Sequence, residues 1–441
     1  MPPATRTLDR EIARLAVPAL GALIAEPLFL LTDTAMVGHL GAAPLAGLGI
    51  ASAVLQTVIG LLVFLAYATT PTVARRLGSG DRRGAIRAGI DGMWLAALLG
   101  ILLALVGVAT AAPLVSLFGP DTDVAAAATT YLLLSLPGLP AMLLVIAASG
   151  LLRGLQDTRT PLVVAGLGFA ANAALNAVFI FGLGWGIGGS AVGTVVAQWG
   201  MATVYVVIAV RAARAASTTL RPGLSGVAGV AASGGWLLLR TASLRVALLA
   251  TVVVATGQGV TQLATMQIAL TVFFTLAFAL DALAIAGQAM IGHALGAADV
   301  VRVTAITRRL VFFGLMGGAA LGVLIAAVSP FAGAVFTSDA AVGAAVTPVL
   351  LTMAAGVPIA GLVFVLDGVL IGAGDARYLA LTGIVNVAVY LPLLGVAGPT
   401  GSPTLLWVAF GLGYITARAV TLSLRARGTR WMVTGAAGRA G

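Results

Sequence analysis

The sequence predicts an all-α polytopic membrane protein with twelve transmembrane helices in two six-helix bundles. Three observations carry this prediction: an apolar composition, an internal repeat at a constant offset of 218 residues, and arginines confined to alternate loops. Hydrophobic residues make up 60% of the 441 residues and charged residues only 9%, with a mean hydropathy of +1.10. Soluble domains need far less apolar surface, so this composition indicates an integral membrane protein.

Apolar windows separated by short charged or Pro/Gly-rich breaks predict the spans. In the first half they are 12–38, 45–72, 88–111, 124–151, 160–183 and 190–211. In the second half they are 237–257, 262–293, 304–328, 341–371, 378–397 and 404–424. Because six spans is an even number, both halves enter the membrane from the same side, and the repeat is parallel.

The repeat is clearest between ASGLLRGLQDTR (148–159) and LDGVLIGAGDAR (366–377), which share five of twelve positions. The same offset pairs Asp81 with Asp299 and Pro140 with Pro358 without a gap. We therefore expect an N-lobe over 1–211 and a C-lobe over 237–441. The Gly/Ala/Ser-rich stretch 212–236 is expected to join them as a cytoplasmic linker.

All 24 basic residues are arginine, and there is no cysteine, so disulfides and thiolate metal sites are excluded. The arginines occupy the N-terminal tail, the loops after every second span, and the C-terminal tail. The alternate loops contain none: 39–44, 112–123, 184–189, 258–261, 329–340 and 398–403. The positive-inside rule then places both termini on the cytoplasmic side of a bacterial-type plasma (inner) membrane. The basic charge is topological, with some attraction for anionic membrane lipid, and does not indicate nucleic-acid binding.

Four of the 14 acidic residues lie deep inside predicted spans: Glu26, Asp33, Asp281 and Asp367. No arginine is expected at comparable depth. A carboxylate in such a place can hold a proton near neutral pH and release it when water enters, which suits a proton-coupled carrier. Glu26 and Asp33 are two helical turns apart, so they share a face roughly 10 Å apart along the axis. A purely structural role stays open for each acid, most of all for Asp281 and Asp367, which could hold the C-lobe together by hydrogen bonds.

Other polar residues in the spans could either bind a ligand or join helices. Asn172 and Asn176, at i and i+4, project from one face and could bind a protonated carboxyl or a substrate hydroxyl, or only join helices. Thr194 could join them, and Gln288 shares a face with Asp281, where helix packing is the favoured reading. Pro27 removes a backbone hydrogen bond beside Glu26 and predicts a hinge in the first helix.

The string AEPLFLLTDTAMVGHLGAAPLAGLGIA (25–51) resembles the multidrug and toxic compound extrusion (MATE) family, in its DinF-like branch. So do LLRGLQDTRTP (151–161), GLGWGIGGSAVGT (182–194) and ALDALAIAGQAMIGHALGA (279–297). The resemblance covers nearly the whole chain. It implies two six-helix bundles that form a V-shaped cavity and exchange between outward and inward states. It also implies secondary active efflux of amphipathic, often cationic compounds against a proton or sodium gradient.

By the same resemblance, Asp33 corresponds to the carboxylate that takes the coupling proton, with Asn172, Asn176 and Thr194 as its neighbours. Some relatives carry a carboxylate where this chain has Asn176, and the amide weakens any sodium site in the N-lobe. Asp281 and Asp367 lie in strings typical of the branch. Related branches place a cation site in this lobe, so a second coupling site is an open possibility here.

The leading hypothesis is thus a multidrug antiporter, exchanging its substrates for protons or sodium ions. The alternative is a flippase of lipid-linked precursors, which favours a cavity rich in arginine; Arg240 and Arg245 are the candidates that could reach inward. An intramembrane enzyme is disfavoured because no nucleophile–base pair appears, and neither HExxH nor GxxxxGK[ST] occurs. We expect no cofactor and no metal, and a monomer.

Overall fold

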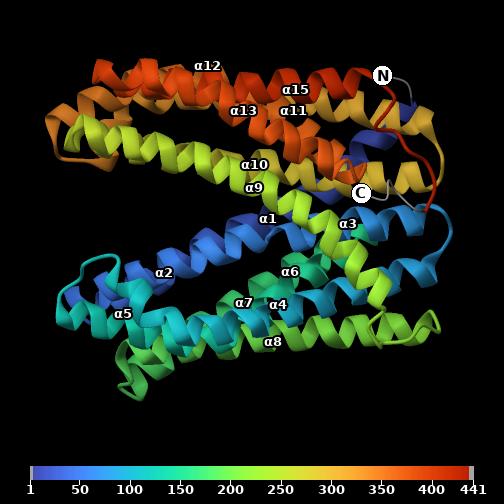
Figure 1. Ribbon diagram of the computed structural model, residues 1–441, viewed down its shortest axis with the longest axis horizontal. Coiled ribbons are helices and arrows are strands. Elements are labelled where there is room, and N and C mark those ends of the chain that lie inside the picture. The colour runs from blue at the N-terminus through green and yellow to red at the C-terminus, as the bar shows by residue number, and fades with distance from the viewer. Residues whose placement is uncertain (1–2, 437–441) are drawn as a thin grey trace. The chain divides into compact units, whose positions relative to one another are not determined.

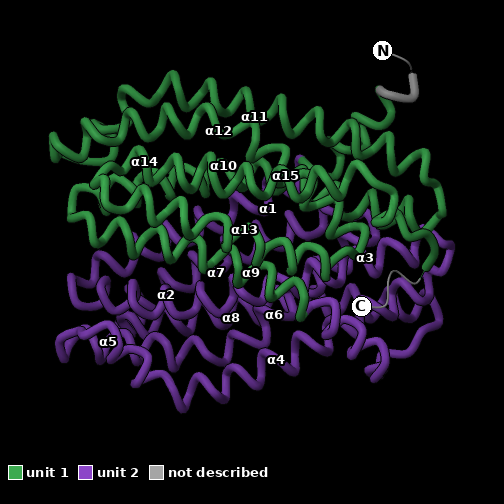
Figure 2. Tube along the Cα trace, turned by 45° about the horizontal axis from the view of Figure 1, so that its top comes forward, with its two compact units in different colours: residues 1–16, 235–441 green, residues 17–234 purple. Residues whose placement is uncertain are grey.

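The structure is a computed structural model that describes residues 3–436. Over these residues it contains helices and no strands (Figure 1). Twelve of its helical stretches are long and apolar enough to cross a membrane. The predicted fold class is therefore confirmed. The chain divides into two compact units, unit 1 (Met1–Ala16 and Gly235–Gly441) and unit 2 (Val17–Gly234), which are coloured separately in Figure 2.

Unit 2 takes most of α1 (Pro3–Gly38), which begins in unit 1, and the first turns of α9 (Leu224–Gln258). Between them it holds the following elements: α2 (Ala42–Leu62), α3 (Phe64–Gly78), α4 (Arg82–Ser116), α5 (Thr122–Ser135), η1 (Leu136–Gly138), α6 (Leu139–Gly154), α7 (Arg159–Ala177), η2 (Val178–Gly182) and α8 (Gly186–Ala215). The helix α6 packs on α3, α4 and α8, and α7 packs on α8.

Unit 1 holds the rest of α9 and the following elements: α10 (Val260–Gly296), α11 (Val300–Phe336), α12 (Ala340–Gly372), α13 (Ala376–Ala397), η3 (Gly398–Thr400), α14 (Pro403–Trp407), η4 (Val408–Tyr414) and α15 (Ile415–Arg427). Here α12 packs on α10, α11 and α15. These are the partners that the 218-residue offset predicts from the contacts of α6, so the packing repeats along with the sequence.

The repeat is also visible in the backbone. Gly41 has a φ of 117° and Gly259 a φ of 120°, each just before a long helix. Such values suit glycine because its lack of a β-carbon removes the steric barrier to positive φ. Asp81 and Asp299 each cap a helix, accepting from the backbone N–H of Gly84 (2.7 Å) and Arg302 (2.8 Å). The internal repeat therefore fixes turns and caps as well as spans.

We expected the first turns of α1 to belong with the first half of the chain. In the structure they belong to unit 1. The physical reason is a pair of ion contacts with α11. Arg309 binds Asp9, with Nη2 2.6 Å from Oδ2, and Arg302 Nη2 lies 2.8 Å from Glu11 Oε1. These acids are in the N-terminal tail, which the repeat does not cover.

The expected linker 212–236 is also largely helical. The helix α8 continues to Ala215 and α9 begins at Leu224, which leaves a loop of residues 216–223. The buried carboxylate of Asp91 in α4 accepts from the Gly223 backbone N–H (2.8 Å) and so satisfies a donor at the start of α9. A β-carbon at Gly226 would overlap the Asp91 side chain. The small residues that suggested a flexible linker thus allow close approach to α4.

Candidate functional site

Asp33 lies in α1 and is only 4% exposed. Its Oδ1 accepts hydrogen bonds from Ser190 Oγ of α8 (2.5 Å) and Asn176 Nδ2 of α7 (2.9 Å). The hydroxyl of Tyr131, in α5, donates a long hydrogen bond to Oδ2 (3.4 Å). Four helices of unit 2 therefore converge on one carboxylate.

A second layer of amide and hydroxyl groups supports this contact. Asn176 Nδ2 also donates to Asn172 Oδ1 (3.2 Å), and Asn172 Nδ2 donates to Thr194 Oγ1 (3.0 Å). A β-carbon at Gly193 would collide with the Asn176 amide, so glycine there lets α8 approach α7 closely. The structure brings Asp33, Asn172, Asn176 and Thr194 into one network, as their positions in the sequence suggested.

The sequence analysis did not name Ser190 or Tyr131 as site residues. Ser190 precedes Thr194 by four residues and lies on the same face of α8, so helical spacing could have indicated it. Tyr131 follows Thr129 and Thr130 in α5, and nothing in its spacing connects it with Asp33.

The environment of Asp33 is neutral. Among residues 3–436, no arginine or histidine forms an ion pair with this carboxylate. Its three partners are hydroxyl and amide groups that donate to it. The amide oxygen of Asn176 is buried and has no hydrogen-bond partner within the same part of the chain. The site can therefore hold a charged carboxylate by donors alone, with one acceptor left over.

Asp33 opens onto a cavity of about 90 Å³ inside unit 2. Glu26, two turns earlier in α1, lines the same cavity and is half-buried. No side chain of the described residues hydrogen-bonds or ion-pairs with Glu26. The two acids of α1 thus share one cavity, but their surroundings differ.

The rest of the cavity wall is largely apolar and polarisable. The rings of Phe29 and Phe169 stack with centroids 5.2 Å apart, and Met142 and Met201 line the same cavity. Aromatic faces attract cations, and methionine adapts to irregular ligands. An acid in this setting can receive the charged end of an amphipathic cation.

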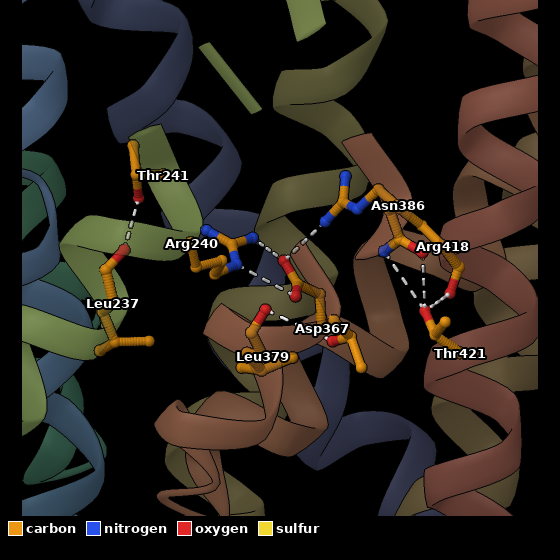
Figure 3. A network of polar contacts seen from close by, with 9 residues as sticks. Leu237, Arg240, Thr241, Asp367, Leu379, Asn386, Arg418 and Thr421 are labelled. Atoms are coloured by element: carbon orange, nitrogen blue, oxygen red, sulfur yellow. Dashed lines mark hydrogen bonds and ion pairs between the residues drawn. The ribbon is translucent and has the colours of Figure 1, made fainter. Parts of the chain in front are cut away.

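Asp367, in α12 of unit 1, has a different environment from the one we expected. It is 6% exposed and forms ion pairs with Arg240 of α9 and Arg418 of α15 (Figure 3). Arg240 Nε and Arg418 Nη2 each lie 3.2 Å from a carboxylate oxygen. The expectation that no arginine reaches this depth was wrong, because both side chains are folded against the helix bundle, 14% and 11% exposed.

The three polar residues proposed for the C-lobe do not form one site. Gln288 is buried in α10, and Asp281, about two turns earlier on the same helix, is half-buried. Neither is among the described residues that line the cavity beside Asp367. Pro27 lies within α1, which continues as helix from Pro3 to Gly38, so a hinge there remains a prediction.

The MatE family model matches residues 18–178 and 239–395, which covers most of both repeats. The chain belongs to the MatE family. The resemblance read from the sequence is thereby confirmed.

Relatives of this MatE protein include Protein DETOXIFICATION 44, chloroplastic, of Arabidopsis thaliana. It is 30% identical over 423 residues, which cover 93% of this chain and 81% of the relative. DNA damage-inducible protein F of Escherichia coli is 26% identical over 305 residues, covering 66% and 64% of the two chains. A solved structure of the Vibrio cholerae MATE transporter VcmN in the bent form matches with a TM-score of 0.87 and 22% identity. It covers 96% of this chain and 98% of that one, and it shows the fold.

MatE proteins are multidrug and toxic compound transporters, and their transport of small-molecule substrates is coupled to ion gradients. With twelve candidate spans, this member is a multi-pass membrane protein. The buried networks described above are therefore parts of a transporter.

Proposed function

We propose that this MatE transporter is a proton-coupled antiporter that exports amphipathic organic cations, with Asp33 as the acid that takes the coupling proton. One observation carries the proposal. Asp33 is a buried carboxylate held by three neutral donors, and no cation pairs with it in the described chain.

Two opposing influences act on this carboxyl group. Burial among apolar helices favours the neutral acid, whereas donors from Ser190, Asn176 and Tyr131 favour the charged form. A small change in hydration or in these contacts then decides whether the proton stays. A permanent ion pair would remove this balance, because an arginine would hold the carboxylate charged at all physiological pH.

The geometry supports protons over sodium as the coupling ion. A hard cation needs a shell of oxygen ligands, but the groups around Asp33 present N–H and O–H donors to it. Asn176 Nδ2, in particular, points at Asp33 Oδ1 and at Asn172 Oδ1. A sodium ion would require this amide to turn over.

Glu26 supports the cationic substrate class. It lies in the same cavity without a hydrogen-bond or ion-pair partner among the described residues, beside the stacked rings of Phe29 and Phe169. Drug-sized sites usually have about 300–1,000 Å³, and this cavity has about 90 Å³. We therefore propose that, in this conformation, it admits the charged group of a substrate and not the whole molecule.

The alternative of a lipid-linked precursor flippase finds less support. The two buried arginines of unit 1 do meet its requirement for cationic groups. However, Asp367 lies between them, and the cavity that they line has room for about 10 Å³. A pyrophosphate headgroup is far larger than that space.

The proposal is tested by transport in proteoliposomes with separately imposed proton and sodium gradients and a cationic dye. Asp33→Asn should abolish pH-driven export, because the amide cannot exchange a proton. Glu26→Gln should raise the KM for cationic dyes while proton-driven turnover persists, since Glu26 contacts the substrate in this scheme.

Asp123→Asn is the matched control, because it makes the same chemical change at an exposed position of α5. Undiminished pH-driven transport by the Asp33 variant, with Asp123→Asn as reference, would refute the role of Asp33. Transport that follows the sodium gradient alone would refute proton coupling.

A further inference from the structure

The cavity that contains Asp33 also has a second group of polar side chains, which the network around Asp33 does not use. They are Glu26 from α1, Gln56 from α2 and Gln198 from α8, and all three line the same cavity of unit 2. In the described part of the chain, no hydrogen bond joins them to another protein group, and their polar atoms are accessible. They are therefore available to a ligand.

The three side chains lie at about the same depth in unit 2. Glu26 precedes Asp33 by two turns, or roughly 10 Å along α1. Ser190 contacts Asp33, and Gln198 follows Ser190 by roughly 12 Å along α8. Because the first and sixth spans run in opposite directions, both displacements point the same way. Gln56 lies roughly 21 Å from the start of α2 and Glu26 roughly 18 Å from the end of α1, so Gln56 reaches the same level.

The wall of the cavity is built to accommodate the amide of Gln198. A β-carbon at Gly138, in η1, would collide with Gln198 Oε1, so glycine there makes room for the side chain. The neighbouring Trp199 donates from Nε1 to the carbonyl oxygen of Pro137 (3.0 Å), which fastens η1 to α8 beside it. A half-turn of the carboxamide exchanges its oxygen and nitrogen, so the group can offer a ligand either an acceptor or a donor.

These groups distinguish between two kinds of organic cation. Polar groups that face a cavity are hydrated, and a ligand that displaces the water has to replace its hydrogen bonds. A protonated primary or secondary amine does so, because its N–H groups donate to the carboxylate and to the amide oxygens. A quaternary ammonium ion has the same charge but no N–H group, so it leaves these acceptors unpaired. The faces of Phe29 and Phe169 attract both kinds of cation.

We propose that Gln56 and Gln198, together with Glu26, make the transporter selective for cations that carry N–H groups over quaternary ammonium ions. This inference rests on the proposed export of amphipathic cations through the cavity, and it narrows the class of substrate. Glu26 supplies the charge, and the two amides supply the acceptors that tell the cations apart. Neither glutamine hydrogen-bonds to Asp33 within residues 3–436, so both can be changed without altering the proposed proton site.

The test uses the full-length protein in proteoliposomes under a fixed proton gradient, with a matched pair of substrates. One is a fluorescent amphipath with a primary ammonium group, and the other is its trimethylammonium analogue, which keeps the charge and the fluorophore. The leak through protein-free liposomes is subtracted. For the wild type we expect kcat/KM to be roughly tenfold higher for the primary ammonium compound, the effect of one lost hydrogen bond to a charged group.

Gln198→Leu should raise the KM for the primary ammonium compound and leave that for the trimethylammonium compound unchanged. Gln56→Leu should act in the same direction. Leucine is close to glutamine in size and suits an apolar wall, so both variants should fold. Gln267→Leu makes the same change at an exposed position of α10 and should keep the wild-type preference.

Equal kcat/KM values for the two compounds in the wild type would overturn the proposal. So would an unchanged preference in both leucine variants at the cavity, or an equal rise of the KM for both compounds. Failure of the proposed function gives a different result, because neither compound is then exported under the proton gradient. Equilibrium binding of both compounds to the purified protein tests the selectivity even in that case, and equal affinities would contradict it.

Discussion

The hydrogen bonds to Asp33 predict a graded change in the pH dependence of transport. Ser190 Oγ lies 2.5 Å from Oδ1, whereas the Tyr131 hydroxyl lies 3.4 Å from Oδ2. Hydrogen bonds to a charged group contribute about 1.5–3 kcal/mol, and about 1.36 kcal/mol corresponds to one pH unit. Removing the hydroxyl of Ser190 destabilises the charged form of Asp33 alone. The proton is then released at higher pH, and the transport profile should move in the alkaline direction by roughly 1–2 pH units.

Tyr131→Phe should move the profile in the same direction by less, because its hydrogen bond is long and therefore weak. The assay is dye export from proteoliposomes under a fixed proton gradient, with the absolute pH varied and the half-maximal pH compared among wild type, Ser190→Ala and Tyr131→Phe. An acidic displacement in the Ser190 variant, or a larger effect of Tyr131→Phe than of Ser190→Ala, would refute this reasoning about which contact holds the charge.

Two further predictions concern stability and topology. Asp367→Asn removes the buried carboxylate with which Arg240 and Arg418 both pair, so it should lower the free energy of unfolding by about 3–5 kcal/mol. Asp339→Asn, at an exposed helix cap, should stay near wild type in the same denaturation series, and equal losses would show that the buried ion pairs are immaterial. The arginine-free alternate loops support a cytoplasmic C-terminus, so a green fluorescent protein fused there should fluoresce and a fused alkaline phosphatase should be inactive, whereas the opposite pattern would overturn the assigned orientation.

Much of the fold follows from patterns that a single sequence displays directly. The apolar windows and their charged breaks predict all twelve spans because the bilayer permits few other structures. The 218-residue offset predicts equivalent turns, such as those at Gly41 and Gly259, because a duplicated chain keeps its backbone geometry. The start of α9 was missed for a physical reason: glycine and alanine form a flexible linker in water but allow close packing beside a helix such as α4.

The sites show the same division between local and long-range information. Asp33, Asn172 and Asn176 could be identified because unusual polar residues in apolar spans demand a reason. The arginine pairs of Asp367 could not, since Arg240 and Arg418 lie 127 and 51 residues away in the chain. Near a helix end, an arginine can reach water or fold inward along the bundle, and hydropathy does not distinguish the two.

The 218-residue repeat allows the buried polar contacts of the two units to be compared position by position. Asp33 corresponds to Thr251 and Asn172 to Tyr390. Asp33 and Asn172 are joined through the Asn176 amide, whereas Thr251 and Tyr390 contact each other directly, with hydroxyl oxygens 2.5 Å apart. The scaffold therefore holds a polar contact at the same place in both halves. Only the network in unit 2 includes a carboxyl group, whereas the hydroxyl groups of threonine and tyrosine stay neutral in the physiological range. This difference supports our proposal that Asp33 takes the coupling proton. In unit 1 the buried carboxylate of Asp367, whose counterpart is Ser149, forms ion pairs with two arginines. We therefore propose that unit 2 exchanges the proton, whereas unit 1 holds a carboxylate in fixed ion pairs.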